Sequence, residues 1–438
     1  MSNAYLTPKS KLMIYGLTKI RGLRWWMIGL IMLGAVINYL TRSTLSVAAP
    51  TLLQDLQIGP EQYSWIVGIF QGAIMLQPLC GYVLDVIGLK RGFAIFAIAW
   101  SLISMAHAFA YNWQILAGLR GLLGLAEGSA NPAGMKATSE WFPARERGIA
   151  GGVYNIGASF GSMLAPPLVA WAILQYNWQS AFVITGVLGL VWVVAWLLLY
   201  HPPEKHPALS PSEFEFITDG QEKHLQDDGT RPSVTSLLRR RNFWGIALPR
   251  FLADPAWGTL TFWMPLYLSQ TRGWDIKQIA LFAWLPFLAA DIGCIFGGTF
   301  SLWMQKYWRL SLINARRASF TLGAVMMLGV GFVGFVQSPY TAIALLSLAG
   351  FAHQTLSVTV ITMSSDLFKK NEVATVAGMA GTFGNAGLLI FSLLIGALVL
   401  KIGYAPFFVC LGLLDVIGAV ILWTVVKTNG EEVETVEV

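Results

Sequence analysis

Long apolar runs separated by short polar stretches dominate this chain of 438 residues. A helix that crosses a bilayer needs about 20 consecutive, mostly apolar residues. The sequence therefore predicts twelve transmembrane helices, near residues 25–46, 62–84, 92–110, 115–136, 149–173, 178–200, 244–268, 277–300, 318–336, 340–364, 374–399 and 404–426. The expected fold class is an all-α membrane protein.

The composition supports lipid as the main solvent. Hydrophobic residues make up 55% of the chain and charged residues only 12%, whereas a soluble domain carries about 25% charged residues. The formal net charge of +6 lies mainly between the apolar runs, so it does not indicate a nucleic-acid partner. The three cysteines lie in apolar runs and the five histidines are scattered. We therefore expect no disulfide framework, no metal site and no bound cofactor.

The distribution of Lys and Arg predicts the orientation of the chain. Of the 29 such residues, only Arg272, Lys277 and Lys401 lie in the loops on one side of the predicted spans. Cytoplasmic loops carry the excess of positive charge, so we expect both termini in the cytoplasm. The basic N-terminus resembles a signal peptide, but its apolar run is long and lacks a convincing cleavage site. An uncleaved first span is expected.

A polar segment, residues 201–243, divides the predicted spans into two groups of six. Its composition is too polar, and its length too short, for a folded domain. We interpret it as a cytoplasmic linker between an N-terminal bundle (1–200) and a C-terminal bundle with a short cytoplasmic tail (244–438).

The two predicted bundles share an internal repeat. A shift of 226 residues aligns SEWFPARERGIAGG (139–152) with SDLFKKNEVATVAG (365–378), and it also aligns Phe182-Val183 with Phe408-Val409. Chance matching in Gly- and Ala-rich sequence is the alternative explanation. Parallel repeats with a binding site between them near the membrane midplane are an architecture of secondary transporters.

Charged residues inside the predicted spans are candidates for a functional site. Arg120 and Glu127 are seven positions apart, so two helical turns place them on one face. Charges within a span are costly unless they face a watery cavity or each other. Arg250 and Asp254, one turn apart in the seventh span, either line a cavity or neutralise each other within the bundle.

The segment Gly81-Tyr-Val-Leu-Asp85-Val-Ile-Gly88-Leu-Lys90-Arg91 resembles the loop between spans two and three of the major facilitator superfamily. An acid and two bases at a helix end can latch the two halves together on the cytoplasmic side; a solvated turn is the alternative. The charged run Arg145-Glu146-Arg147 after span four is assigned to the same predicted latch.

Further motifs are similar to the anion:cation symporter family of this superfamily, and in particular to its bacterial hexuronate transporters. The resemblance covers nearly the whole chain. Its residues are Tyr39-Leu40-Thr41-Arg42, the series Arg120, Glu127, Pro132, Trp141-Phe142-Pro143 and Glu146-Arg147, then Trp178, the span-seven string Trp244 to Gly258, and Gly350-Phe-Ala-His-Gln354.

The resemblance implies that Arg42 binds the carboxylate of the substrate. A guanidinium can grip a carboxylate through two hydrogen bonds and cannot be titrated away; an arginine that reaches lipid headgroups is the alternative. Sugar hydroxyls need polar donors and acceptors, and each candidate is equally suited to an interhelical hydrogen bond. These candidates are Tyr39, Asn155, His353, Gln354 and Asn385.

Glu127 is the candidate proton carrier. A carboxyl in a poorly hydrated cavity binds a proton more readily, because desolvation disfavours its charged form. Arg120 would stabilise the ionised form, so that protonation changes a salt bridge; a static structural pair is the alternative. Thr41 departs from family members that carry a second acid there, so at most one proton through Glu127 is expected.

The sequence thus predicts a monomeric proton symporter of the bacterial inner membrane that imports a monovalent sugar acid, most closely a hexuronate such as glucuronate or galacturonate. The alternatives are an importer of another organic anion, such as an aldonate or aldarate, and an uncoupled uniporter. The chain carries no HExxH or P-loop signature and no soluble sensing domain, so an enzyme or receptor is not expected.

Overall fold

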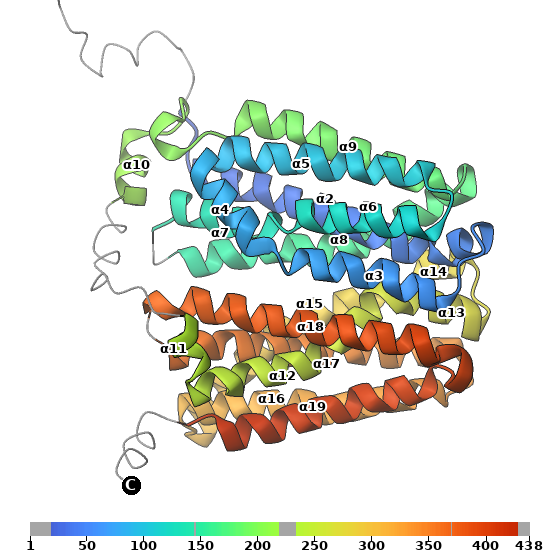
Figure 1. Ribbon diagram of the computed structural model, residues 1–438. Helices are drawn as coiled ribbons and strands as arrows, with labels where there is room; N and C mark the ends of the chain where they lie inside the picture. The colour runs from blue at the N-terminus through green and yellow to red at the C-terminus, as the bar shows by residue number, and fades with distance from the viewer. Residues whose placement is uncertain (1–18, 144–145, 219–233, 369, 428–438) are drawn as a thin grey trace, which may run out of the picture.

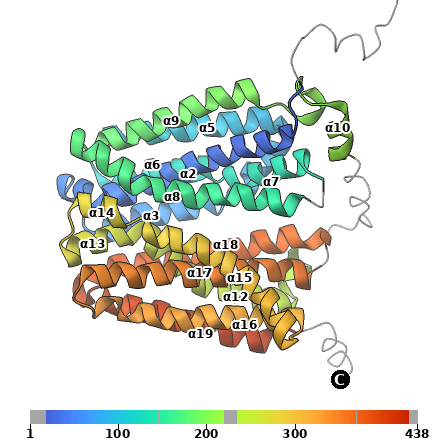
Figure 2. The ribbon, with the colours of Figure 1, turned by 180° about the vertical axis from the view of Figure 1, so that it is seen from behind.

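The computed structural model describes residues 19–143, 146–218, 234–368 and 370–427. Within these ranges the chain forms helices and turns, and no strand occurs. The helices lie side by side in two stacked groups (Figures 1 and 2), which we call the N-terminal and C-terminal bundles. The all-α fold class is confirmed for this part of the chain.

The N-terminal bundle begins with a long helix. In chain order its helices are α2 (Leu23–Asp55), α3 (Pro60–Ile74), α4 (Gln77–Ile87), α5 (Leu89–Ala106) with the short η1 (His107–Phe109), α6 (Trp113–Glu127), α7 (Ala130–Trp141), α8 (Arg147–Gln175) and α9 (Trp178–Leu199). It contains two helices that are interrupted: α3 and α4 form a bent pair, and α6 and α7 are separated by a short break.

The C-terminal bundle repeats this alternation of long and interrupted helices. It comprises α12 (Arg241–Gly258), the π-helical turn η3 (Thr259–Trp263), α13 (Met264–Arg272), α14 (Ile276–Phe282), α15 (Leu285–Trp308), α16 (Leu312–Leu328) with η4 (Gly329–Gly334), α17 (Pro339–Leu367), α18 (Lys370–Ile402) and α19 (Ala405–Val425).

Helices occupy all twelve predicted span ranges, but not all of them qualify as spans by length and composition. Among the described residues nine helices qualify, and the bent pair α3 and α4 makes ten. The expected span 115–136 is divided between α6 and α7, and 244–268 contains Arg250 and Asp254. Pro78 lies in the first turn of α4, where its missing N–H group favours the start of a new helix after α3.

All described linker residues lie at one end of the molecule, on the left in Figure 1, which we call the linker end. The linker is partly helical, with η2 (Pro203–Lys205), α10 (Pro211–Thr218) and α11 (Val234–Leu238). The sequence did not predict these helices, because their short polar segments have no apolar periodicity. The two longer linker helices gain stability from contacts with the bundles: α10 contacts the N-terminal bundle and α11 contacts the C-terminal bundle.

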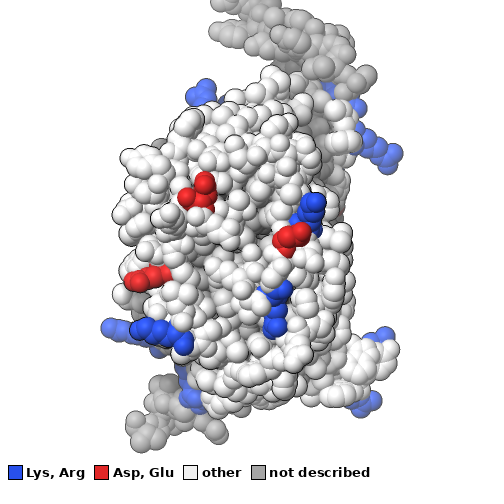
Figure 3. Space-filling view, turned by 90° about the vertical axis from the view of Figure 1, so that its right-hand side faces the viewer, with Lys and Arg blue, Asp and Glu red and all other residues white. Residues whose placement is uncertain are grey.

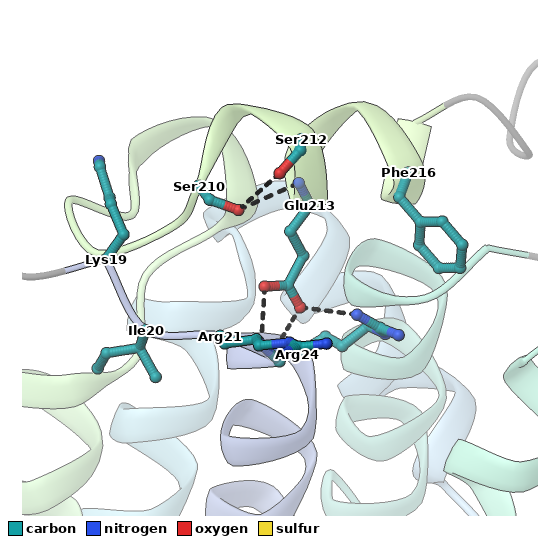
Figure 4. A pocket seen from close by; sticks show the side chains of 9 residues that line it. Lys19, Ile20, Arg21, Arg24, Ser210, Ser212, Glu213 and Phe216 are labelled. Carbon is teal, nitrogen blue, oxygen red and sulfur yellow. Dashed lines mark hydrogen bonds and ion pairs between the residues drawn. The ribbon is translucent and has the colours of Figure 1, made fainter.

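Glu213 of α10 fixes the linker to the start of α2 (Figure 4). Its carboxylate accepts hydrogen bonds from the backbone N–H groups of Gly22 and Leu23, at 3.1 and 3.2 Å. It also pairs with Arg24 Nη1 at 2.8 Å, and Arg24 Nε contacts Glu146 Oε2 at 2.9 Å. A carboxylate at a helix N-terminus satisfies free N–H groups and complements the helix dipole.

The opposite end of the molecule, which we call the far end, carries few charges. Figure 3 shows this face, where isolated charged side chains interrupt an otherwise uncharged surface. The basic residues of the far-end turns are Arg272, Lys277 and Lys401. The basic residues are thus concentrated at the linker end, as the distribution of Lys and Arg along the sequence predicts.

Close helix packing in the N-terminal bundle depends on two glycines of α8. A Cβ added to Gly157 would lie 2.6 Å from the Met32 carbonyl oxygen, and one added to Gly161 would lie 2.3 Å from that of Val36. Both carbonyls belong to α2, so α2 and α8 approach backbone to backbone. Small residues permit such approaches between membrane helices.

We expect Gly161→Val to destabilise the N-terminal bundle, because the new side chain must push α2 away from α8. Overpacking of this kind costs about 1–3 kcal/mol. Thermal unfolding of the purified protein in detergent measures the loss. Gly152→Val is the matched control, since a Cβ at Gly152 meets no atom within 4 Å. Equal melting temperatures for the two variants would contradict the prediction.

Candidate functional site

A cavity of about 820 Å³ lies between the two bundles. The N-terminal bundle contributes lining residues from α2, α3, α4, α6, α7 and α8, and the C-terminal bundle from α12, η3, α17 and α18. The volume falls within the range of about 300–1,000 Å³ that is typical of small-molecule sites. The cavity can hold a ligand in contact with both halves of the chain.

The cavity extends toward the linker end and is closed toward the far end. Its lining reaches Ser139 and Gly151, which flank the linker-end turn between α7 and α8. Toward the far end, the Tyr63 hydroxyl of α3 donates a hydrogen bond to the Phe262 carbonyl at 2.6 Å. A Cβ on Gly396 of α18 would lie 2.2 Å from Ser64 of α3. These contacts join the two bundles and seal the cavity on that side.

An ion pair between Arg42 of α2 and Glu127 of α6 forms the charged centre of the N-terminal wall. Arg42 Nε lies 3.0 Å from Glu127 Oε2, and Arg42 Nη2 donates to Asn38 Oδ1 at 3.3 Å. The guanidinium lies over the Tyr39 ring, 4.4 Å from its centroid. The Glu127 side chain has no exposed surface, whereas that of Arg42 is 15% exposed. Arg42 therefore presents the positive charge to the cavity.

The sequence predicts a salt bridge between Arg120 and Glu127, and the structure places the pair differently. Glu127 contacts Arg42, and Arg120 Nη1 instead donates to the backbone carbonyl of Arg42 at 3.2 Å. Arg120 is 1% exposed and does not line the cavity. Its role is to support the Arg42 backbone from behind and to add positive charge near Glu127. Sequence spacing cannot reveal contacts between different helices, so the contact of Glu127 with Arg42 could not be predicted from it.

The C-terminal wall holds a second ion pair and an aromatic stack. Arg250 Nη2 and Asp254 Oδ2 lie 3.3 Å apart, and both residues line the cavity. The sequence leaves open whether these two residues line a cavity or neutralise each other. In the structure they do both. The rings of Trp257 and His353 stack with centroids 5.6 Å apart and an interplanar angle of 19°. This wall offers flat apolar surface beside polar groups, as a sugar ring requires.

Most of the predicted binding residues meet at the cavity. Tyr39, Arg42, His353, Gln354 and Asn385 line it together with Glu127. The Asn385 amide also donates to the Gly381 carbonyl at 3.1 Å, which fixes its orientation. The side chain of Asn155 lies outside the described part of the structure.

Several polar residues of the lining were not predicted from the sequence. Tyr154 is the clearest: its hydroxyl donates to the Ala130 carbonyl at 2.8 Å, and its ring fills the space that a side chain at Gly134 would occupy. A glycine in α7 opposite a tyrosine in α8 gives no signal in the sequence. The others are Gln71, Gln77, Asn131, Thr138, Ser139, Ser162, Thr261 and Ser357.

The predicted latch residues lie at the linker end, but much of the latch cannot be described. Gly88 joins α4 to α5 with φ +85°, a conformation that favours glycine. Lys90 follows in α5, where its carbonyl accepts from Trp196 Nε1 at 2.9 Å, and Arg91 is exposed. Gly81 of α4 faces Pro132 of α7. Arg145 and the side chains of Asp85 and Arg147 lie outside the described residues, so a closed latch stays a prediction.

Glu146, the remaining latch residue, contacts Arg24 of α2 rather than a group of the C-terminal bundle. Arg24 contacts Glu213 of the linker at the same time. Glu146 therefore belongs to a contact within the N-terminal half in this conformation.

Residues 31–315 match the Major Facilitator Superfamily. The chain belongs to the Major Facilitator Superfamily. This membership agrees with two helix bundles around a central cavity and places the protein among transporters rather than enzymes.

Relatives within the superfamily include sugar-acid transporters. The chain is 48% identical to a hexuronate transporter of Escherichia coli, over 94% of this chain and 96% of that protein. It is 51% identical to a galacturonate transporter of Dickeya chrysanthemi, over 74% of this chain and 95% of that protein. A D-galactonate transporter of Escherichia coli is 27% identical over 90% of this chain and 94% of that protein.

A solved structure supports the fold. A bacterial homolog of the human lysosomal transporter Spinster, in an inward-facing and unoccupied conformation, superimposes with a TM-score of 0.70 at 15% sequence identity. The alignment covers 92% of this chain and 95% of that one. The closure of this chain at the far end is shown by its own contacts, Tyr63 with Phe262 and Ser64 with Gly396.

We expect a bulky substitution at the far-end contact between the bundles to destabilise the conformation described here. Gly396→Val inserts a side chain between α18 and Ser64, so the two bundles can no longer meet. Because alternating access requires both closures, we expect counterflow exchange to fall at least tenfold while the protein still folds. Leu394→Val, on an exposed position of the same helix, is the control. Normal exchange by Gly396→Val would contradict the assigned closure.

Proposed function

We propose that this protein imports a monovalent hexuronate, such as glucuronate or galacturonate, together with a proton. The observation that carries the proposal is the Arg42–Glu127 ion pair at the wall of a central cavity. The two hexuronate and galacturonate transporters, at 48% and 51% identity, support the substrate class.

The substrate carboxylate competes with Glu127 for the Arg42 guanidinium. Arg42 is partly exposed to the cavity and Glu127 is not, so an anion can approach only the arginine. Arginine binds carboxylates in a planar, two-bonded geometry that the single contact to Glu127 leaves incomplete. The hydroxyls of the sugar then meet Tyr39, Gln354 and Asn385, and its ring meets Trp257.

Proton coupling follows from the same competition. When the substrate takes the guanidinium, Glu127 keeps a buried carboxylate without its partner, and protonation removes that unfavourable charge. Proton and substrate therefore stabilise the same state, which is the condition for a ligand to shift a conformational equilibrium. Release of the proton restores the Arg42–Glu127 pair and expels the substrate.

The proposed location is the bacterial inner membrane, with the linker end and both termini in the cytoplasm. The excess of Lys and Arg at the linker end supports this orientation. The conformation described here is then open to the cytoplasm. The central cavity is formed by one chain, so the proposed working unit is a monomer embedded in lipid.

We expect Arg42→Lys to weaken substrate binding about 10- to 100-fold, because an ammonium cannot reproduce the two-bonded geometry and a charged hydrogen bond is worth about 1.5–3 kcal/mol. Titration of the purified protein with glucuronate measures the dissociation constant. The control is Arg239→Lys, an exposed linker arginine. Unchanged affinity in Arg42→Lys would remove Arg42 from the site.

Glu127→Gln is expected to abolish accumulation driven by an inward proton gradient in proteoliposomes, while counterflow exchange of glucuronate persists. Glutamine imitates the protonated acid, so binding and the bundle motion survive without a proton cycle. Glu140→Gln, on the adjacent α7 and outside the cavity lining, is expected to accumulate substrate normally. Wild-type uptake that ignores the gradient would refute coupling and leave a uniporter.

Competition assays distinguish the substrate classes. Glucuronate and galacturonate should inhibit labelled glucuronate uptake at lower concentration than galactonate, the substrate named for a relative with 27% identity. Stronger inhibition by galactonate would favour an aldonate importer.

A further inference from the structure

Arg250 and Asp254 of α12 form a charged pair in the C-terminal wall of the cavity, whereas Arg42 belongs to the N-terminal wall. Arg250 Nη2 lies 3.3 Å from Asp254 Oδ2. The Arg250 side chain is 19% exposed and that of Asp254 is 15% exposed, and both residues line the cavity. A ligand that fills the cavity therefore meets both members of the pair. The transport cycle proposed above makes no use of them.

The carboxylate of Asp254 is held between Arg250 and α18, against which α12 packs. A Cβ on Gly384 of α18 would overlap Asp254 Oδ2, so the helix backbone approaches the carboxylate as closely as only glycine permits. Asn385 follows Gly384 and lines the cavity, and Trp257, one turn after Asp254, lines it too. The Asp254 carboxylate thus lies among the side chains that we propose to hold the sugar.

The contact with Asp254 uses only part of the binding capacity of Arg250. A guanidinium has five N–H donors, and Arg250 donates to Asp254 through Nη2. The Nε atom of Arg250 is buried and has no hydrogen-bond partner among the described residues. Without the negative charge of Asp254, Arg250 would be a cation with free donors at the cavity wall. Such an arginine is a binding site for a carboxylate.

The arginines and carboxylates of the cavity lining balance one another. Among the described lining residues the arginines are Arg42 and Arg250, and the carboxylates are Glu127 and Asp254. In the proposed cycle a proton neutralises Glu127, which leaves one positive charge for a monovalent anion to balance. A divalent anion would leave one negative charge uncompensated in a site removed from bulk water, and such a charge is costly.

We propose that Asp254 restricts the site to sugar acids with one carboxylate, because it neutralises Arg250 and faces the end of the substrate that Arg42 does not hold. This inference rests on the proposed function. A hydroxyl group at that end of the substrate donates a hydrogen bond to the Asp254 carboxylate. A second carboxylate at that end, as in an aldarate, meets the negative charge of Asp254 and is rejected.

The test titrates the purified protein with galacturonate, galactonate and galactarate. The first two acids carry one carboxylate and galactarate carries two. Galactonate and galactarate are both open chains, so their comparison isolates the effect of the second carboxylate. We expect Asp254→Asn to bind galactarate at least about tenfold more tightly than the wild type does, since a hydrogen bond to a charged group contributes roughly that factor or more. The affinity for galactonate should change by less than about threefold, because this acid has no second carboxylate for Arg250.

Two further variants test the assigned roles. The double variant Arg250→Gln with Asp254→Asn removes both charges, and we expect it to lose the gain in galactarate affinity, because Arg250 supplies the second carboxylate site. Asp366→Asn is the matched control: Asp366 pairs with Arg316 at 3.1 Å in the same bundle and lies outside the cavity lining. This control should bind all three acids as the wild type does. Asp254→Ser provides a second neutral variant if asparagine prevents folding.

A wild type that binds galactarate as tightly as galacturonate would overturn this inference and leave the proposed function standing. An unchanged galactarate affinity in folded Asp254→Asn would also overturn it, as would a gain that persists in the double variant. A wild type that binds neither galacturonate nor glucuronate would instead overturn the proposed function, and this inference with it.

Discussion

The cost of a buried charge is the constraint on which the rest of this structure depends. In the interior of a membrane protein, a guanidinium or a carboxylate persists only if another charge or a set of hydrogen bonds compensates it. Each bundle meets this requirement with an arginine–acid pair at the cavity wall, Arg42 with Glu127 and Arg250 with Asp254. In the transport cycle that we propose, a substrate anion disturbs such a pair, and a proton compensates the charge that is left.

The sequence predicted the helices better than their contacts. Apolar runs and the charge asymmetry between loops are local properties, and they located helices in all twelve expected ranges. Charged and polar residues within those runs also indicated the position of the cavity, which is lined by Arg42, Glu127, His353, Gln354 and Asn385. Charged residues are rare in membrane spans and usually face a cavity or another charged group, so their presence in a span is a strong indication of a functional site.

The pairing of these residues could not be predicted, because it depends on which helix faces which. Arg120 and Glu127 share a helix, but Glu127 contacts Arg42 on another helix, 85 positions away in the chain. Tyr154 was missed for the same reason: its place opposite Gly134 is set by the approach of α7 and α8. The short linker helices were missed because their order comes from docking, as in the contacts of Glu213 with the start of α2.

The docking of the linker has a consequence for observing the protein at work. α10 is fixed to the N-terminal bundle through Glu213 and Arg24, while α11 is fixed to the C-terminal bundle, where Trp244 Nε1 of α12 donates to the Leu238 carbonyl at 2.8 Å. The two linker helices are thus attached to different rigid bodies. The separation between a fluorescent label on α10 and another on α11 is a built-in gauge of how far the halves have opened at that end, read without any label near the cavity.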